Sequence, residues 1–503
     1  TASKMKVLEK PTMTRDDLFL APLIEGESEE LLGTNPQLVD SLVSALGSPL
    51  NFIFPDRVRE NLDNFRSVVA SHALRSRIFF AHKCNRSDSL VRELALTGAC
   101  IDVSSAEELK HALACGFASS RIQCTGPKNR DFLALSLLHG TVISVDSLYE
   151  LSLILDLRAN LKTEERTRIL LRVCGFRGEH INFKTKASRF GIQVDKAEEA
   201  LALLELNSES LELLGFSYHV DTVSIAEKAL ALENCLELIE LSYEYGFEPT
   251  VINIGGGFKV NYLDNEDDWN RYTTALKEAV LGSRSSLTWH NASFGLSARK
   301  GTLAGSLNIY NFYDPSTGPD FLNELLDFKL VNLNNATIAS TLRENGIELW
   351  IEPGRSLIAQ CGITAARVIG LKESSAGDTL VLLDMKRQDT SFIDQELFID
   401  PIILSTGDTA TAPLVMPTPV YFAGNLCLES DLITKRQVFL ERLPKPGDLA
   451  VFANTAGYFM DFSASHSIMQ PVAKKVAVFK EKENFAWTLD EKYCPWRAKE
   501  GKE

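Results

Sequence analysis

The stretch RIFFAHKCNRSD, from Arg77 to Asp88, joins an apolar run to a lysine and then to a polar segment that begins a helix. The apolar run has the β-branched and aromatic character of a buried strand, and Lys83 stands at its end. Taken alone, Lys83 is more simply a surface lysine just past a strand. The rest of the chain has to decide whether this amine has a function.

From residue 77 onward, short β-rich runs alternate with longer helical patterns, which is typical of parallel βα units. The pattern SSAEELKHALACG is one such helix, with Ser104 or Ser105 as its cap and Gly116 at its end. Eight strands with intervening helices predict a closed (β/α)8 TIM-like barrel. We expect the strands at 77–83, 99–105, 121–126, 141–147, 168–174, 213–220, 249–257 and 348–354.

The pattern of apolar and turn-forming residues changes at both ends of this region. Beyond Arg355, apolar runs alternate with Pro and Gly turns, which predicts a mainly antiparallel C-terminal β domain. We therefore expect an N-terminal arm at 1–48 that contributes to the β domain, a barrel at 49–362 and the β domain at 363–503. An insertion at about 262–345 separates the last two barrel strands, either as a lid or interface element or as a solvated excursion.

Composition excludes several classes of protein. The 503 residues are 45% hydrophobic and carry a formal charge of −15, which opposes binding to nucleic acid or to an anionic membrane. No apolar segment is long enough to span a bilayer, and the first residues lack the apolar core of a signal peptide. Nine cysteines without a CxxC pair or a Cys/His cluster at metal spacing predict reduced thiols, no metal site and a cytoplasmic location.

The predicted strand ends carry an unusual concentration of functional side chains. Because the active site of a (β/α)8 enzyme lies at the carboxyl ends of its strands, we expect these side chains to meet. They are Lys83, Asp102, Ser104, Thr125, Gly126, Asp146, Ser147, Arg172, His219, Gly255 to Gly257, Glu352 and Arg355.

An ordered set of motifs resembles the pyridoxal-phosphate decarboxylases that act on diaminopimelate, ornithine and related basic amino acids. The set covers roughly residues 50–470 and is far more specific than any single motif. It consists of FAHKCN, IDVSSAEEL, SRFG (188–191), HVDT, GGGF, EPGR, CLESD and AGYFMDF. The resemblance implies a pyridoxal-phosphate enzyme of fold type III, a carbon–carbon lyase that decarboxylates a small amino-acid substrate.

The resemblance also gives roles to the cofactor-binding residues. Lys83 is the amine that forms a Schiff base with pyridoxal phosphate. Gly255, Gly256 and Gly257 let backbone amides approach the phosphate, although such a run by itself is as easily a turn before a helix. Arg355, Thr222 and Tyr458 complete the phosphate site, as the matching family positions imply.

Three further side chains are expected around the cofactor ring. Glu352 faces the pyridine nitrogen and keeps the ring protonated, which favours loss of carbon dioxide; related alanine racemases carry an arginine there. His219 stacks on the ring, and Asp102 lies near Lys83. Without the resemblance, Glu352 is equally a turn carboxylate, His219 a hydrogen-bonded core residue and Asp102 a helix cap. We expect Lys83 and Glu352 to face one cofactor.

The β domain is expected to supply the remaining active-site groups. Cys427 resembles the family cysteine that protonates the decarboxylated carbon, and Glu429 and Asp431 are the corresponding substrate-binding acids. In relatives this segment reaches the partner's active site, so we expect an obligate homodimer. A buried structural thiol is the simpler interpretation of Cys427 taken alone.

Two departures from the family pattern leave the substrate open. Asp221 replaces the glycine of the family's His-x-Gly-Ser motif, and LLDMKRQDTSFIDQELF matches poorly where relatives bind substrate. The leading hypothesis is a decarboxylase of a diaminopimelate-like, ornithine-like or lysine-like amino acid, or of a specialised-pathway derivative. An amino-acid racemase and a non-catalytic homologue that holds the cofactor are the alternatives.

Overall fold

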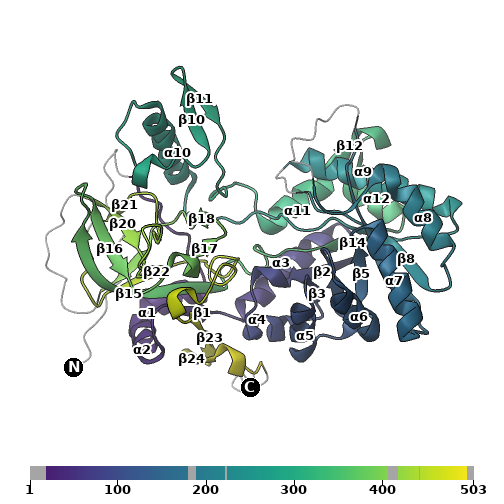
Figure 1. Ribbon diagram of the computed structural model, residues 1–503, viewed down its shortest axis with the longest axis horizontal. Coiled ribbons are helices and arrows are strands. Elements are labelled where there is room, and N and C mark those ends of the chain that lie inside the picture. Colours follow the sequence, from purple (N-terminus) through teal and green to yellow (C-terminus); the bar gives the residue numbers. More distant parts are fainter. Residues whose placement is uncertain (1–17, 179–187, 221–223, 406–416, 441, 496–503) are drawn as a thin grey trace. The chain divides into compact units, whose positions relative to one another are not determined.

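The computed structural model describes residues 18–178, 188–220, 224–405, 417–440 and 442–495. The chain divides into two compact units (Figure 1). Unit 1 comprises Thr1–Arg57, Val260–Pro315 and Ile358–Glu503, and unit 2 comprises Val58–Lys259 and Ser316–Leu357.

Unit 2 is a closed barrel of eight parallel strands. The strands follow one another in the order β2-β3-β4-β5-β6-β8-β9-β14, and β14 pairs with β2 to close the sheet. This confirms the predicted fold class and all eight predicted strands, which are shorter or longer by a few residues. They are β2 (Ser76–Ala81), β3 (Cys100–Val103), β4 (Ile122–Cys124), β5 (Val142–Val145), β6 (Thr167–Cys174), β8 (Leu211–Ser217), β9 (Val251–Asn253) and β14 (Glu348–Ile351). A two-residue strand, β7 (Ile192–Gln193), pairs with the end of β6.

Helices surround the strands on the outside of this barrel (Figure 1). Several begin with a side-chain cap. Ser105, one of the two predicted caps, accepts a hydrogen bond from the backbone of Glu108 at 3.1 Å, and Ser147 does the same for Glu150. The helices are α3 (Arg57–Ser71), α4 (Asp88–Ala95), α5 (Ala106–Ala114), α6 (Arg130–His139), α7 (Leu148–Leu161), α8 (Ala197–Glu205), α9 (Ile225–Glu244), α11 (Gly318–Asp327) and α12 (Ile338–Glu344).

The barrel interior changes from apolar to polar along the strands. One buried layer consists of Phe79, Cys100, Val142, Leu170, Val251 and Trp350. The rings of Phe79 and Trp350 lie 4.8 Å apart in this layer, and burial of each contributes about 2–3 kcal/mol. Nearer the carboxyl ends, buried Asp102, Gln123 and Asn253 replace apolar side chains. The apolar layer therefore closes the barrel below a polar mouth.

Unit 1 is built on a nine-stranded, mainly antiparallel sheet, as predicted. Its path is β21-β20-β16-β15-β1-β23-β24, with β22 pairing both β15 and β19. Two pairs are parallel, β1 with β23 and β16 with β20. The strands are β1 (Leu50–Ile53), β15 (Gly362–Glu373), β16 (Thr379–Leu383), β19 (Ile402–Leu404), β20 (Thr418–Ala423), β21 (Val438–Leu440), β22 (Leu449–Phe452), β23 (Lys474–Glu481) and β24 (Asn484–Leu489).

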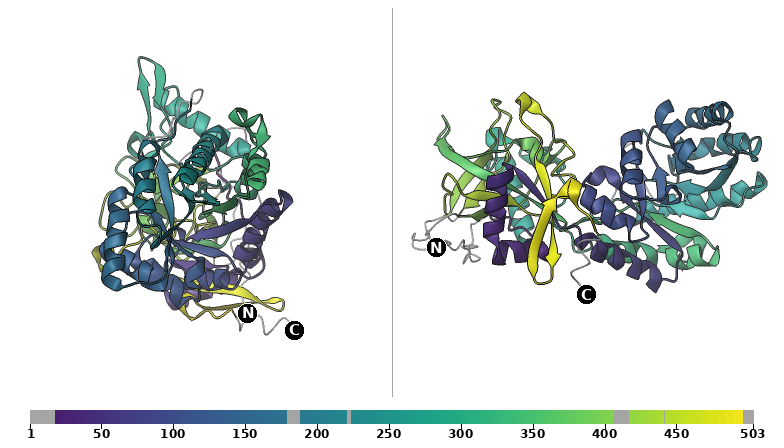
Figure 2. Two further views of the ribbon diagram at one scale, coloured as in Figure 1. Left: turned by 90° about the vertical axis from the view of Figure 1, so that its right-hand side faces the viewer. Right: turned by 90° about the horizontal axis from the view of Figure 1, so that it is seen from below.

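The N-terminal segment packs within unit 1. Helices α1 (Glu27–Thr34) and α2 (Pro36–Leu46) share a buried core with β1, which lies between β15 and β23 in the sheet. The hairpin of β23 and β24 runs beside these helices (Figure 2), and Lys480 pairs with Glu30 there. Strand β1 and helix α1 thus contact strand β23, which is more than 400 residues later in the chain.

The segment expected as a single insertion, about 262–345, is divided between the units. Helix α10 (Glu266–Leu281) and the hairpin of β10 (Leu296–Arg299) and β11 (Thr302–Gly305) belong to unit 1. Helices α11 and α12, with the short pair β12 (Lys329–Leu330) and β13 (Ala336–Thr337), belong to unit 2. Aromatic packing explains the first assignment, because Trp269 and Phe312 contact Phe398 of the same unit.

Among the described helices, none combines the length and the apolar character that a bilayer crossing requires.

Candidate active site

Five neighbouring strands of the barrel bring most of the predicted residues to one part of its mouth. In spatial order β3, β2, β14, β9 and β8, they carry or are followed by Asp102, Lys83, Glu352, the glycines 255–257 and His219. These residues are far apart in the sequence. Closure of the barrel through β2 and β14 places the first and last strands side by side.

Lys83 lies just beyond its strand. Strand β2 ends at Ala81, which is paired with Asp102 of β3, and Lys83 follows in the 3-10 turn His82–Cys84. The prediction that the strand runs to Lys83 is therefore wrong by two residues, because the backbone turns once it leaves the ladder. His82 and Cys84 are buried while Lys83 is exposed, so this turn leaves the side chain of Lys83 accessible at the end of β2.

The carboxylate of Glu352 is fixed by two amide side chains. Its Oε1 accepts hydrogen bonds from Gln123 Nε2 at 2.6 Å and from Asn253 Nδ2 at 2.7 Å. Asn253 also donates to Gln123 Oε1 at 3.0 Å, so the two amides orient each other. Charge-assisted bonds of this kind are about twice as strong as neutral ones, and they hold Glu352 in one rotamer.

Asp102 shares this network from the neighbouring strand. Thr125 donates to its Oδ2 at 3.1 Å, and Gln123 Nε2 lies 3.4 Å from its Oδ1. Burial, together with the negative charge of Glu352, raises the pKa of Asp102 well above its usual value, while the charge of Lys83 opposes the rise. Lys83, Asp102 and Glu352 therefore act on one another through the same small volume.

The three glycines form a turn in which Gly255 and Gly256 are packed too closely for any side chain. A Cβ on Gly255 would lie 2.7 Å from the carbonyl oxygen of Tyr218, and one on Gly256 would lie 2.6 Å from that of Glu352. Gly255 and Gly257 also have positive φ angles of 69° and 86°. The turn thus joins the ends of β8 and β14, with Glu352 N donating to Gly255 O at 2.9 Å.

His219 contacts this glycine turn from the end of β8. Its Nδ1 accepts a hydrogen bond from the backbone N–H of Gly256 at 3.3 Å. The surrounding protein keeps water away from much of the imidazole ring, although part of the residue is exposed. This desolvation, followed by the charges of Lys228, Lys83 and Arg172, lowers the pKa of His219 well below its usual value. Both the accepted bond and the nearby cations favour a neutral imidazole.

Three contributing residues escaped the sequence prediction. Gln123 and Asn253 are buried polar residues inside the apolar strands RIQCTG and PTVINIGGG, and that polarity was the available signal. Lys228 on α9 is 2% exposed, and its Nζ donates to Gly256 O at 3.0 Å. A lysine in the first turn of a long helix offers no comparable signal.

The SRFG motif lies beside the opposite strands of the barrel mouth. Arg172 of β6 lies over the ring of Phe190 with its guanidinium carbon 4.6 Å from the ring centroid, and its NH1 is 3.6 Å from Asp146 Oδ1. Gly191 N donates to the same oxygen at 3.2 Å. These contacts hold residues 189–191 against the ends of β5 and β6.

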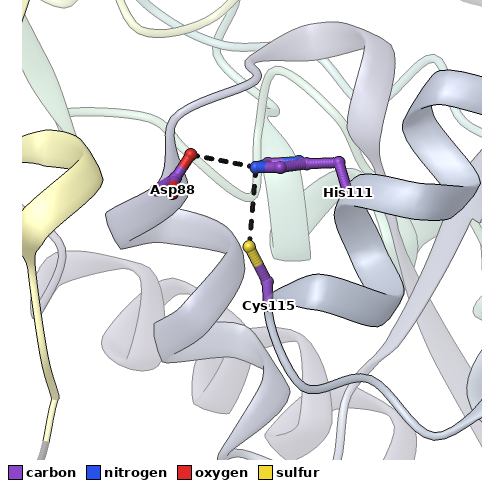
Figure 3. A group of neighbouring side chains, drawn as sticks. All are labelled: Asp88, His111 and Cys115. Carbon is purple, nitrogen blue, oxygen red and sulfur yellow. Dashed lines mark hydrogen bonds and ion pairs between the residues drawn. The ribbon is translucent and has the colours of Figure 1, made fainter.

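Asp88, His111 and Cys115 form a polar cluster (Figure 3), and His111 of this cluster also contacts His82 in the turn that carries Lys83. His111 Nε2 lies 3.0 Å from Asp88 Oδ1 and 3.5 Å from Cys115 Sγ, and its Nδ1 is 2.7 Å from Nε2 of buried His82. The hydrogen bonds to Asp88 and Cys115 raise the pKa of His111 to about 9. Three donor atoms this close can surround a metal ion, but an imidazolium hydrogen-bonded on both nitrogens accounts for the arrangement.

The predicted residues of unit 1 lie on two loops of its sheet. Cys427 and Glu429 are exposed, whereas Asp431 is buried and accepts 2.8 Å hydrogen bonds from the backbone N–H groups of Arg387 and Leu426. Tyr458 is half-buried with a φ of 72°. Both oxygens of Asp431 thus hold the loop that carries Cys427.

Two of the residues predicted to bind the phosphate, Arg355 and Thr222, belong to unit 2. Arg355 is half-buried just after β14. Thr222, like the unusual Asp221, lies outside the residues that the structure describes.

Comparison with known proteins finds matches in one family of enzymes. Residues 56–287 match the model of the pyridoxal-dependent decarboxylases, specifically their pyridoxal binding domain. A protein of Sinorhizobium fredii with no assigned function is 29% identical over 92% of this chain and 95% of its own length. Diaminopimelate decarboxylase of Bacillus subtilis is 28% identical over 84% of this chain and 85% of its own length.

Solved structures share the fold. Diaminopimelate decarboxylase of Helicobacter pylori, complexed with L-lysine, aligns with a TM-score of 0.64 at 18% identity, over 89% of this chain and 95% of that one. Arginine decarboxylase of Paramecium bursaria Chlorella virus aligns with a TM-score of 0.62 at 17% identity, over 88% and 100% of the two chains.

Proposed function

Since residues 56–287 are the pyridoxal-binding domain of a pyridoxal-dependent decarboxylase, we propose that the chain removes the α-carboxylate of a basic or diamino amino acid. Diaminopimelate-like, ornithine-like and lysine-like substrates, or a derivative of one of them, form the candidate class. The named relatives support this class, because they include diaminopimelate and arginine decarboxylases. The fixed position of Glu352 at the barrel mouth is the observation that carries the proposal.

The residues at the barrel mouth fit the chemistry of pyridoxal phosphate. The cofactor has an aldehyde, a ring nitrogen and a phosphate, and these groups need an amine, a proton-holding partner and anion-binding amides. Lys83 supplies an exposed amine, Glu352 an oriented carboxylate, and the glycine turn closely packed backbone. When bound, the cofactor supplies an electron sink that stabilises the carbanion left by loss of carbon dioxide.

Each residue has a defined task in this proposal. Lys83 would hold the cofactor through its aldehyde, and Glu352 would hold a proton at the ring nitrogen. The hydrogen bonds from Gln123 and Asn253 keep the Glu352 carboxylate from rotating away. His219 presents a neutral ring, so it adds no cation beside the cofactor. Asp102, with its raised pKa, retains a proton more readily than an ordinary aspartate and limits negative charge near Lys83.

The residues of unit 1 complete the proposal. Cys427 is exposed on its loop, and we assign it the protonation of the decarboxylated carbon in a homodimer whose active sites are shared. Glu429 contacts the substrate, and Asp431 holds the loop in place through Arg387 and Leu426. Tyr458 of this unit, and Arg355 and Thr222 of unit 2, stay predicted phosphate ligands.

A panel assay tests this function. Purified protein is loaded with pyridoxal phosphate and incubated with D- and L-forms of lysine, ornithine and arginine and with diaminopimelate, and released carbon dioxide is measured. We expect release from at least one basic amino acid and its loss in Lys83→Ala. Exchange between enantiomers without carbon dioxide would show a racemase, and a protein that takes up no cofactor would refute both enzymes.

Borohydride reduction tests the attachment site independently of turnover. It should fix the cofactor to the tryptic peptide that contains Lys83. The Cys427→Ser variant should lower kcat by about 100–10,000-fold, the range typical of losing a general acid, while leaving this labelling unchanged. Labelling at another lysine would contradict the assignment of Lys83.

A further inference from the structure

Lys228 lies against the glycine turn from the side of helix α9. Its Nζ donates to Gly256 O at 3.0 Å and is 3.2 Å from the position a Cβ on Gly257 would occupy. The side chain is 2% exposed, and the backbone of Lys228 is held by a 2.8 Å hydrogen bond from Tyr218 Oη to its carbonyl oxygen. The ammonium is therefore fixed beside the turn and is not a mobile surface charge.

The charge of Lys228 reaches the groups at the barrel mouth. It is the first of the three cations that lower the pKa of His219, and His219 in turn accepts the N–H of Gly256. Lys228 donates a hydrogen bond to the carbonyl oxygen of Gly256, and the backbone N–H of Gly256 donates to His219. The glycine turn thus lies in a positive potential that Lys228 helps to create.

We propose that the ammonium of Lys228 is a cationic component of the phosphate site, in addition to the glycine backbone. This inference rests on the proposed binding of pyridoxal phosphate at the turn. A phosphate dianion is attracted more strongly by a fixed, buried cation than by an exposed one, because less water lies around the pair to screen the charges.

The alternative is that Lys228 only supports the backbone by holding the carbonyl of Gly256. The two roles differ in what they require. A structural role needs a hydrogen-bond donor and affects every ligand of the site equally. A role in phosphate binding needs a positive charge and affects only ligands that carry the phosphate.

The test compares pyridoxal phosphate with pyridoxal, which lacks the phosphate, in binding to apoprotein followed by visible absorbance. In wild type we expect pyridoxal phosphate to bind far more tightly. In Lys228→Met and Lys228→Gln we expect its affinity to fall by about 10–100-fold, the range for losing one charged hydrogen bond, while pyridoxal affinity stays within about twofold. Lys228→Arg should restore most of the preference. Inorganic phosphate should compete less effectively in the Met and Gln variants than in wild type.

Two lysine variants serve as controls. Lys259→Met removes a charge two residues beyond the turn, where Nζ lies 5.2 Å from the Phe321 ring centroid, and Lys110→Met removes an exposed charge paired with Glu107. Both should keep the wild-type preference. Circular dichroism checks that each variant is folded, and the Gln variant retains a donor for the Gly256 carbonyl if Met proves too disruptive.

The outcomes separate this inference from the proposed function. If Gln behaves as wild type, or if both ligands weaken equally in the Met and Gln variants, the charge of Lys228 has no role in phosphate binding. If wild-type protein binds neither ligand, the proposed function fails and this inference fails with it. A wild-type protein that binds pyridoxal phosphate while the variants keep the full preference overturns this inference alone.

Discussion

Asp102 and Glu352, which lie on β3 and just after β14, share one hydrogen-bond donor: Gln123 Nε2 is 2.6 Å from Glu352 Oε1 and 3.4 Å from Asp102 Oδ1. Two carboxyl groups this close do not both ionise easily in a buried site. Burial and the charge of Glu352 raise the pKa of Asp102, and Gln123 and Asn253 donate hydrogen bonds to the carboxylate of Glu352. The network thus gives the two acids different roles.

Glu352→Gln should reduce decarboxylation by about 100–1000-fold, because the amide supplies no negative charge to hold a proton at the ring nitrogen. Cofactor binding should persist, since glutamine has the same shape and retains an oxygen acceptor. Steady-state kinetics and the visible spectrum measure the two effects. Glu348→Gln, on the same strand but paired with Arg77, is the matched control and should keep kcat. Equal activity in wild type and Glu352→Gln would contradict the assigned role.

Asp102→Asn should stabilise the apoprotein at neutral pH by about 1 kcal/mol, because it removes a buried acid whose ionised form burial disfavours. The folded-state pKa of Asp102 is raised, so its contribution to stability is present in acid and is lost as pH rises through that pKa. The difference in unfolding free energy between variant and wild type should therefore grow from pH 4 to pH 7. Urea unfolding measures it, with exposed Asp131→Asn as the control. A constant difference across this range would count against the raised pKa.

His111→Gln should remove a stabilising contribution that depends on pH. The pKa of His111 is raised to about 9 in the folded chain, above the usual 6.5, so the contribution is complete below about pH 6 and is lost as pH rises through 9. After allowance for partial exposure, we expect a destabilisation of about 1–2 kcal/mol at pH 6 and little above pH 9.5. Thermal unfolding in a chelating buffer measures it, with exposed His139→Gln as control. A loss that does not vary with pH would exclude the imidazolium.

Asp431→Asn should destabilise unit 1 by about 1–3 kcal/mol. Both carboxylate oxygens accept backbone N–H groups, from Arg387 and Leu426, and an amide side chain replaces one acceptor with a donor. The loop at 426–430 should then become more sensitive to limited proteolysis. Glu429→Gln changes an exposed neighbour and should leave both measurements unchanged. If Asp431→Asn alters KM but neither stability nor proteolysis, the loop-holding role is wrong.

Much of the barrel was predictable because its signals are local. Each strand is a short apolar run, and several helices have caps such as Ser105 that act within a few residues. The prediction failed at Lys83 by two residues, since the strand ends where pairing with β3 stops, and pairing is a property of the sheet. The division of segment 262–345 between the units was likewise unpredictable, because it depends on contacts such as that of Trp269 with Phe398.

The candidate site divides in the same way. Residue types at the strand ends predicted Lys83, Glu352, His219 and the glycines, whereas the partners that orient them were found only in the folded chain. Gln123, Asn253 and Lys228 come from elements where a polar residue is usually exposed or incidental.

The order of strands and helices, and the acids and amines at their ends, follow from the sequence, because periodic burial and turn chemistry act over a few residues. Which of these groups meet was decided by the tertiary structure alone. Strand register and the pairing of β2 with β14 place Asp102 and Glu352 beside Gln123 Nε2. The carboxylate of Asp431 accepts hydrogen bonds from two backbone N–H groups. Such meetings depend on packing across the whole barrel or sheet, which no single stretch of sequence encodes.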